Sequence, residues 1–260
     1  MKIDSKYFKD YRKSLGFTSQ KATKDFFAAK DIKAPIDYAY IEALNQRLCD
    51  ITIKTNDLVS DEIKDDNINS FCAQNILEVF NKLREHEIIP RLNNQGRRPE
   101  HVYFSWMRGY VISTFFLKAL SYFFEVDIDT IELIGDDDLE SIATFRRTPK
   151  ADMQVKLNDG EVLRVEVQSG FQGVNDIKQH KVLEAKSVKK SNGLSSLVVH
   201  FDLYNGQVAF VSLNDIDDDS INWITRQQME GQTVFNIAQN YFRWKLTEKP
   251  PKFSEIRMDL

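Results

Sequence analysis

The 260-residue chain contains only two cysteines, ten glycines and six prolines, and its formal charge is −4. Cys49 and Cys72 are too few and too far apart for a Cys-x-x-Cys zinc cage or for the disulfide framework of a small secreted domain. Low glycine and proline contents exclude collagen-like and low-complexity chains. A charge near balance also excludes a bulk polycation that coats nucleic acid without selectivity. We therefore expect a folded protein of the reducing cytoplasm.

Long apolar runs are also missing. The most apolar stretch, residues 111–124, is shorter than a bilayer span and includes Lys118. The first ten residues lack the uninterrupted apolar core of a secretory signal peptide. We therefore expect no membrane partner. The sequence also lacks a Gly-x-Ser-x-Gly elbow, a phosphate-binding loop and a His-Glu-x-x-His zinc helix, so it does not point to the hydrolases, nucleotide-binding proteins or zinc proteases that carry them.

The first hundred residues have the apolar spacing of helices. Apolar side chains recur every three or four positions behind a candidate N-cap, Asp37, and again in residues 71–89. Gly, Pro and amide residues then cluster at positions 93–99, which indicates a boundary. The sequence therefore predicts a helical N-terminal module, residues 1–95, which would clamp DNA or mediate dimerisation, and a second domain, residues 96–260.

The second domain alternates between helical and strand patterns. Helices are expected over residues 102–124 and 175–190, and a last helix over residues 234–242. Short strand candidates surround Ile131, Ala151, Leu163, Leu197 and Val208. This order predicts an α/β fold in which a mixed β-sheet is flanked by helices.

Two strand patterns flank the Asn-Asp-Gly sequence at residues 158–160. Apolar and polar residues alternate on both sides of it, so each strand has one polar face. The sequence suits a three-residue hairpin loop with its glycine in the left-handed conformation. Because the loop length fixes the register, Arg164 should face Gln154, and Asp152 should face Glu166 directly.

Two opposed carboxylates call for a counter-charge. Asp152 and Glu166 would have Cβ atoms about 4.5–5.5 Å apart and would repel each other. Mg²⁺ would relieve the repulsion, because it takes oxygen ligands and needs only one or two carboxylates beside water and phosphate oxygens. The alternative is that one carboxylate pairs with Lys150, Lys156 or Arg164 on a solvated face.

Asp152, thirteen intervening residues and Glu166-Val167-Gln168, carried on a hairpin that a helix follows, resemble the motif of the PD-(D/E)xK nuclease superfamily, which includes many type II restriction endonucleases. The order of elements extends the resemblance over about residues 100–215. It implies a restriction-endonuclease-like core and a Mg²⁺-dependent endodeoxyribonuclease that hydrolyses DNA phosphodiester bonds. By this resemblance Asp152 and Glu166 bind the metal, and Gln168 orients the attacking water from the position that usually holds Lys.

Local charge suggests where DNA would bind. Residues 141–200 contain ten basic and six acidic side chains, whereas the rest of the chain is acidic. Such a segment attracts phosphate or is an ordinary solvated helix face. Candidate DNA contacts are Arg146, Arg147, Gln172, Asn175, Lys178 and Lys181. The amides of Gln172 and Asn175 can read adenine edges, and Asn175 can equally cap the following helix. Lys181 is either a snorkelling lysine or a substitute for the missing catalytic lysine.

Three functional classes remain open from the sequence. The favoured one is a restriction enzyme that cuts double-stranded DNA as a two-fold dimer or as a monomer. The second is a repair, recombination or mobile-element nuclease of the same superfamily. The third is a DNA-binding or protein-interaction module that keeps the fold without the chemistry, and the neutral Gln168 is the feature that favours it.

Overall fold

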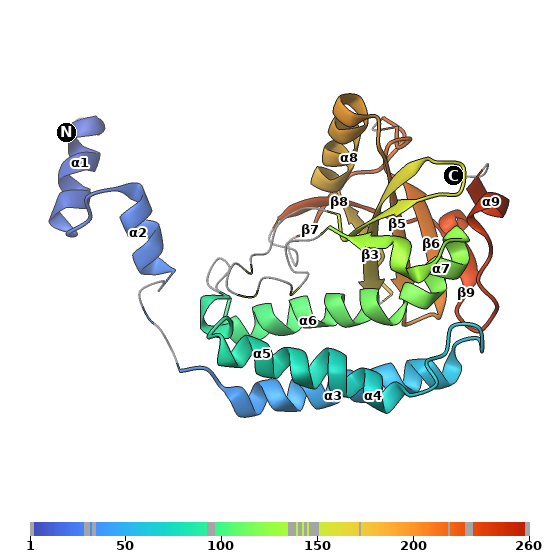
Figure 1. Cartoon of the computed structure of the whole chain (residues 1–260). Helices are drawn as coiled ribbons and strands as arrows, with labels where there is room; N and C mark the ends of the chain where they lie inside the picture. Colours follow the sequence, from blue (N-terminus) through green and yellow to red (C-terminus); the bar gives the residue numbers. More distant parts are fainter. Residues whose placement is uncertain are drawn as a thin grey trace.

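The computed structural model places a six-stranded mixed β-sheet against a layer of long helices (Figure 1). It describes residues 3–28, 32, 35–92, 97–134, 139, 142, 145, 151–171, 173–217, 219–226 and 231–257. The predicted α/β class, a mixed sheet flanked by helices with a helical N-terminal region, is confirmed.

The large sheet has the strand order β1-β2-β3-β5-β6-β9. Its strands are β1 (Ile131–Leu133), β2 (Met153–Lys156), β3 (Val162–Gly170), β5 (Ser195–Asp202), β6 (Gln207–Ser212) and β9 (Phe242–Lys245). The first three pair antiparallel, and β3 then pairs parallel with β5. The crossover between β3 and β5 contains helix α8 (Gln179–Asn192), while β5, β6 and β9 pair antiparallel.

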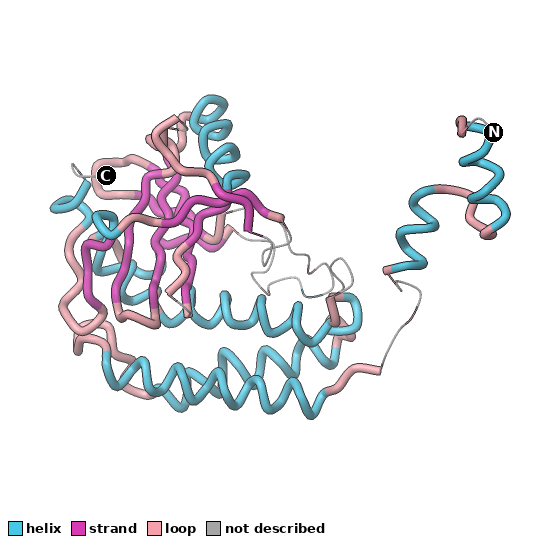
Figure 2. The backbone as a smooth tube through the Cα atoms, turned by 180° about the vertical axis from the view of Figure 1, so that it is seen from behind, coloured by secondary structure: helices cyan, strands magenta, loops and turns pink. Residues whose placement is uncertain are grey.

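The long helices run below the strands of this sheet in Figure 1, and the view from behind shows the same arrangement (Figure 2). The helices of this layer are α3 (Tyr38–Leu58), α4 (Ile68–Cys72), α5 (Val79–Glu85) and α6 (Pro99–Phe115), with a π-helical segment (Ala73–Glu78) between α4 and α5. The predicted cap of α3 is confirmed, because Asp37 Oδ1 accepts a hydrogen bond of 2.9 Å from the Tyr40 N–H. The apolar helix predicted over residues 102–124 is interrupted at Phe116, after which α7 (Leu117–Phe124) begins.

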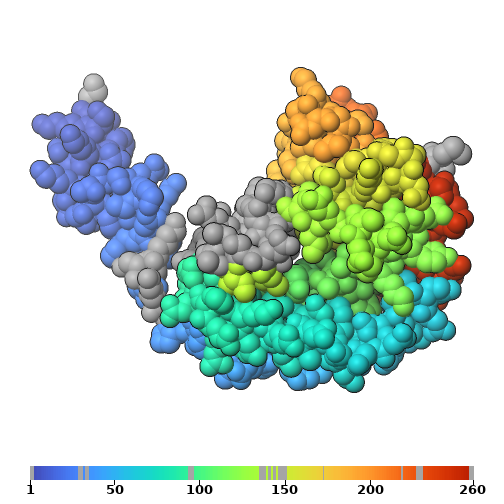
Figure 3. All heavy atoms as spheres, in the orientation of Figure 1, coloured from blue at the N-terminus to red at the C-terminus, as the bar shows by residue number. Residues whose placement is uncertain are grey.

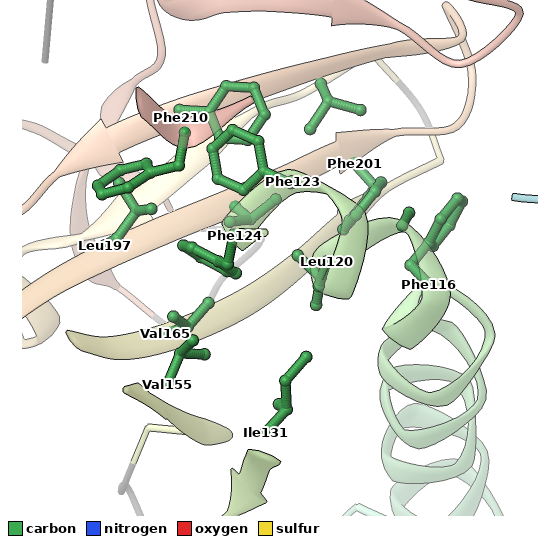
Figure 4. Packing of buried hydrophobic residues seen from close by; sticks show 14 of the residues in the cluster. Phe116, Leu120, Phe123, Phe124, Ile131, Val155, Val165, Leu197, Phe201 and Phe210 are labelled. Carbon is green, nitrogen blue, oxygen red and sulfur yellow. The ribbon is translucent and has the colours of Figure 1, made fainter. Parts of the chain in front are cut away.

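Aromatic side chains fill the space between the sheet and α6 and α7 (Figure 4). Phe116 stacks on Phe201 with ring centroids 4.0 Å apart, and Phe123 stacks on Phe210 at 4.3 Å. The opposite face of the sheet is covered by α8 and by a smaller sheet of order β4-β8-β7. The small sheet consists of β4 (Asp176–Lys178), β7 (Ile224–Arg226) and β8 (Gln232–Asn236). Alternate residues of β3 therefore point to two different layers.

The helix predicted over residues 234–242 is wrong. That segment contains β8, a 3₁₀ turn (Gln239–Tyr241) and the start of β9. In a segment of only nine residues, apolar side chains at mixed spacing are compatible with either a helix or a strand. Here β8 pairs with β4 on one side and with β7 on the other, and these hydrogen bonds favour the strand. The helix expected from residue 175 likewise begins later, at Gln179, because β4 pairs with β8 first.

Helix α6 contributes to two of the hydrophobic cores. Val102 and Met107 pack among α3 and α5, whereas Ile112 and Phe115 pack against the sheet. The two N-terminal helices, α1 (Ser5–Ser14) and α2 (Gln20–Phe27), bury no residue and stand apart from the body in the space-filling view (Figure 3). None of the helices in the described ranges is long and apolar enough to cross a bilayer.

The last short elements complete the outline. Helix α9 (Phe253–Ile256) packs its Phe253 ring against Phe123 and Phe124 of α7. Two further 3₁₀ turns are formed by Ile89–Arg91 and Ile128–Thr130.

Candidate active site

The β2–β3 hairpin has the predicted register. Gln154 pairs with Arg164, and the Leu157 N–H donates a 2.8 Å hydrogen bond to the Glu161 carbonyl. The loop between them is therefore three residues long. Its Gly160 has a φ of +88°, the left-handed conformation that glycine adopts without steric cost. The hairpin carries its polar face toward α8, away from the aromatic core.

Asp152 lies one residue before β2 and contacts β3. The ladder between the two strands ends at Met153, and beyond it Asp152 Oδ2 accepts a 2.7 Å hydrogen bond from the Val167 N–H. The Asp152 carbonyl accepts a further hydrogen bond, 3.2 Å, from the N–H of Ile134 just after β1. The Asp152 carboxylate is therefore fixed beside the peptide that joins Glu166 to Val167. Asp152 does not pair directly with Glu166 in the ladder as predicted, because the pairing of β2 with β3 ends one residue earlier.

Glu166 of β3 forms an ion pair with Lys181 of α8. The Lys181 Nζ lies 2.9 Å from Glu166 Oε2, and the two side chains are only 14% and 15% exposed. Burial raises the pKa of Glu166, and the positive charge of Lys181 acts in the opposite direction. Lys181 thus does not extend its ammonium into water as a snorkelling lysine would. Its charge is held at the candidate site.

A second ion pair lies beside the first on the same interface. Arg164 of β3 contacts Glu184 of α8 with 2.8 Å between Nη2 and Oε1. Glu184 raises the pKa of Glu166, and Arg164 lowers it, so the four charges interact. An interface of two ion pairs can also hold a helix on a sheet without any chemistry. The Arg164–Glu184 pair is therefore the natural control for the Lys181–Glu166 pair.

Gln168 lies two residues beyond Glu166 on the same face of β3. It is half-buried, and its amide forms no hydrogen bond to any residue that the structure describes. In the parallel register it pairs with His200 of β5, a residue that the sequence did not indicate. His200 is 2% exposed, and its Nε2 lies 2.8 Å from Asn175 Oδ1. β5 is buried along nearly its whole length, so its own pattern does not single out His200, and only the register with β3 places His200 opposite Gln168.

The predicted DNA contacts have different outcomes. Asn175 is buried, and its Nδ2 donates a 3.2 Å hydrogen bond to Asp202 Oδ2. The Asn175 side chain is therefore hydrogen-bonded inside the protein and is not available to contact the edge of a base. Asn175 also does not cap α8, because Lys178 occupies the N-cap position, where it is half-buried. Arg146, Arg147 and Gln172 lie outside the described residues.

Comparisons with protein-family models, curated proteins and solved structures gave no significant match. The site is therefore judged by its own chemistry. The described ranges contain no group of three or more His, Cys, Asp and Glu side chains arranged to hold a metal. Asp152 and Glu166 form a smaller set, a pair of carboxylates. That set fits Mg²⁺, which binds through one or two carboxylates when water and substrate phosphates complete its shell.

Burial of His200 leads to a prediction about stability. Desolvation lowers the pKa of His200 to about 4, against the smaller opposing effects of Asp202 and Asp176. Since an unfolded His titrates near ~6.5, the unfolded chain binds more protons between these two values. This contribution to the free energy of unfolding is complete above pH ~6.5, and on the order of 3 kcal/mol is lost as the pH falls to about 4. Urea unfolding at several pH values measures the loss, and His200→Gln should reduce it. An equal loss in both proteins would contradict the prediction.

Proposed function

We propose that the protein is a Mg²⁺-dependent endodeoxyribonuclease of the type II restriction class. One observation carries the proposal: two segments contact adjacent residues of β3, Asp152 at the Val167 N–H (2.7 Å) and Lys181 at the Glu166 carboxylate (2.9 Å). The order of elements supports it, since α6 and α7 precede three antiparallel strands, a helix and a parallel strand. This is the order on which the resemblance to the PD-(D/E)xK superfamily rests.

Each residue has a role that its chemistry supports. Asp152 and Glu166 would hold Mg²⁺, which when bound would supply a Lewis acid and lower the pKa of a water. The Gln168 amide forms no hydrogen bond to another described residue, so it can orient the attacking water by donating or accepting a hydrogen bond. Lys181 supplies the positive charge that a neutral amide at position 168 cannot. Its contact with Glu166 places that charge at the metal-binding carboxylate.

Digestion of supercoiled plasmid by the full chain tests the proposal. Discrete linear fragments that need Mg²⁺ and disappear with EDTA are expected. Nicks that depend on DNA structure instead would assign the protein to repair or recombination. DNA binding without cleavage would overturn the enzymatic proposal in favour of a binding module. Asp152→Asn protein purified in parallel identifies cleavage by any contaminating nuclease.

Gln168→Ala should cleave slowly but measurably. Positioning of a water by an uncharged group is worth typically ~10²–10⁴-fold in rate, and the two carboxylates remain. Gln168→Lys should retain more activity than Ala, because it restores the commoner residue of the resembled family. Single-turnover cleavage at saturating Mg²⁺ measures both, with Gln154→Ala on the neighbouring strand as the control. A Gln168→Ala enzyme as fast as wild type would exclude this role.

A further inference from the structure

Arg108, in the middle of α6, differs from the other arginines that are partly or fully buried. Those in the described ranges are Arg108, Arg164 and Arg226. Arg164 and Arg226 each have a carboxylate oxygen at 2.8 Å, from Glu184 and Asp176. The Arg108 guanidinium instead lies over the Phe171 ring, 4.9 Å from its centroid, and forms no ion pair with a described residue. Among the described residues, this half-buried cation has an aromatic contact and no ion pair.

The surroundings of Arg108 add positive rather than negative charge. Desolvation lowers the pKa of Arg108, and the charge of Arg97 lowers it further. Arg97 is exposed, and it too lacks an ion pair with any residue in the described part of the chain. The neighbouring Arg98, by contrast, contacts Glu100 at 2.6 Å. A half-buried guanidinium that has an aromatic contact but no acidic partner among the described residues is suited to bind an anion.

The position of Arg108 relates it to the candidate active site. Helix α6 packs against β3, and Phe171 directly follows the last residue of that strand. Phe171 is also only three residues beyond Gln168. The Arg108 guanidinium is therefore held beside the C-terminal end of β3, where Phe171 packs against the aromatic core just beyond the segment that carries Glu166 and Gln168.

We infer that Arg108 forms a binding site for a phosphate group. A guanidinium is planar and permanently charged, and it donates paired hydrogen bonds that match the oxygens of a phosphate. The phosphate is a backbone phosphate of the DNA that enters the candidate active site, and this assignment of its source rests on the proposed function. Phe171 holds the Arg108 side chain by stacking, which leaves the N–H groups at the edge of the guanidinium available.

Binding of a fluorescent DNA duplex in EDTA tests the site separately from cleavage. Arg108→Gln should weaken binding to unrelated sequences equally and reduce the slope of log K against log salt by about one unit, the effect of one lost phosphate contact. Arg108→Lys should keep most of the slope because it keeps the charge. Arg84→Gln is the matched control, since Arg84 also stacks on a ring, Tyr38 at 4.6 Å, but has an acid partner, Glu42.

Inorganic phosphate added at constant ionic strength distinguishes the source of the ligand. If phosphate raises the melting temperature of wild type but not of Arg108→Gln, while DNA binding is equal in both, the site takes free phosphate and the DNA assignment is overturned. A salt slope and a phosphate response that Arg108→Gln leaves unchanged would overturn the site itself. A reduced slope in a protein that never cuts DNA would support the site and refute the nuclease.

Discussion

Asp152→Asn is expected to abolish cleavage without unfolding the protein. Asn keeps the volume of the side chain and one carbonyl oxygen, which can still accept the hydrogen bond from the Val167 N–H. It removes the negative charge that would hold Mg²⁺. Because the metal supplies both the Lewis acid and the activated water, the rate should fall by more than the ~10²–10⁴-fold that loss of one acid–base group typically costs.

The hairpin offers a matched control for this substitution. Asp159, in the loop, also accepts a hydrogen bond from a backbone N–H, that of Glu161 at 2.9 Å, and it lies outside the candidate site. Asp159→Asn should therefore cleave like wild type. Single-turnover rates and urea unfolding of both variants give the comparison. Near wild-type cleavage by Asp152→Asn, with both proteins folded, would show that this hairpin does not hold the metal.

The β2–β3 hairpin is the part of the site that could be predicted from the sequence, because neighbouring residues determine it. Alternation with a period of two and a short Asn-Asp-Gly loop fix the register of β2 and β3 within about twenty residues of chain. That register is sufficient to bring Asp152 to the segment that carries Glu166. No contact between distant segments has to be known.

The Lys181–Glu166 contact depends on long-range packing and could not be predicted. The rotation of α8 over the sheet decides which side chain meets Glu166, and that rotation depends on where the helix begins. The pairing of β4 with β8, some sixty residues apart in the chain, shifts this start to Gln179. The pairing of β8 with β4 and β7 also explains why this segment forms a strand although its apolar spacing predicts a helix.

His200 was missed for a related reason. A short apolar run such as that of β5 can be recognised as a strand, but the sequence does not state which residue of β3 each residue of β5 faces. The parallel register is set by the length and packing of the crossover through α8. The presence of each strand can therefore be predicted from its own sequence, whereas the pairing of Gln168 with His200 cannot.

Lys181→Gln is expected to lower activity and to move its pH dependence. At present burial raises the pKa of Glu166 and Lys181 opposes this effect. Without the lysine the pKa of Glu166 rises further, so that at a given pH more of the carboxylate is protonated and unable to bind Mg²⁺. The acid limb of the kcat/KM profile should therefore shift to higher pH. Lys181→Arg, which keeps a cation, should leave the limb closer to its original position.

Arg164→Gln separates this electrostatic role from simple support of α8. It removes a cation from the same interface between β3 and α8, but Arg164 influences the pKa of Glu166 less than Lys181 does. Both variants should weaken the packing of α8 to a similar degree, as urea unfolding would show, whereas only Lys181→Gln should shift the acid limb strongly. Equal shifts in the two variants would mean that Lys181 acts by holding the helix. The positive charge at the site would then have to come from elsewhere, and the neutral Gln168 would again favour a binding module over a nuclease.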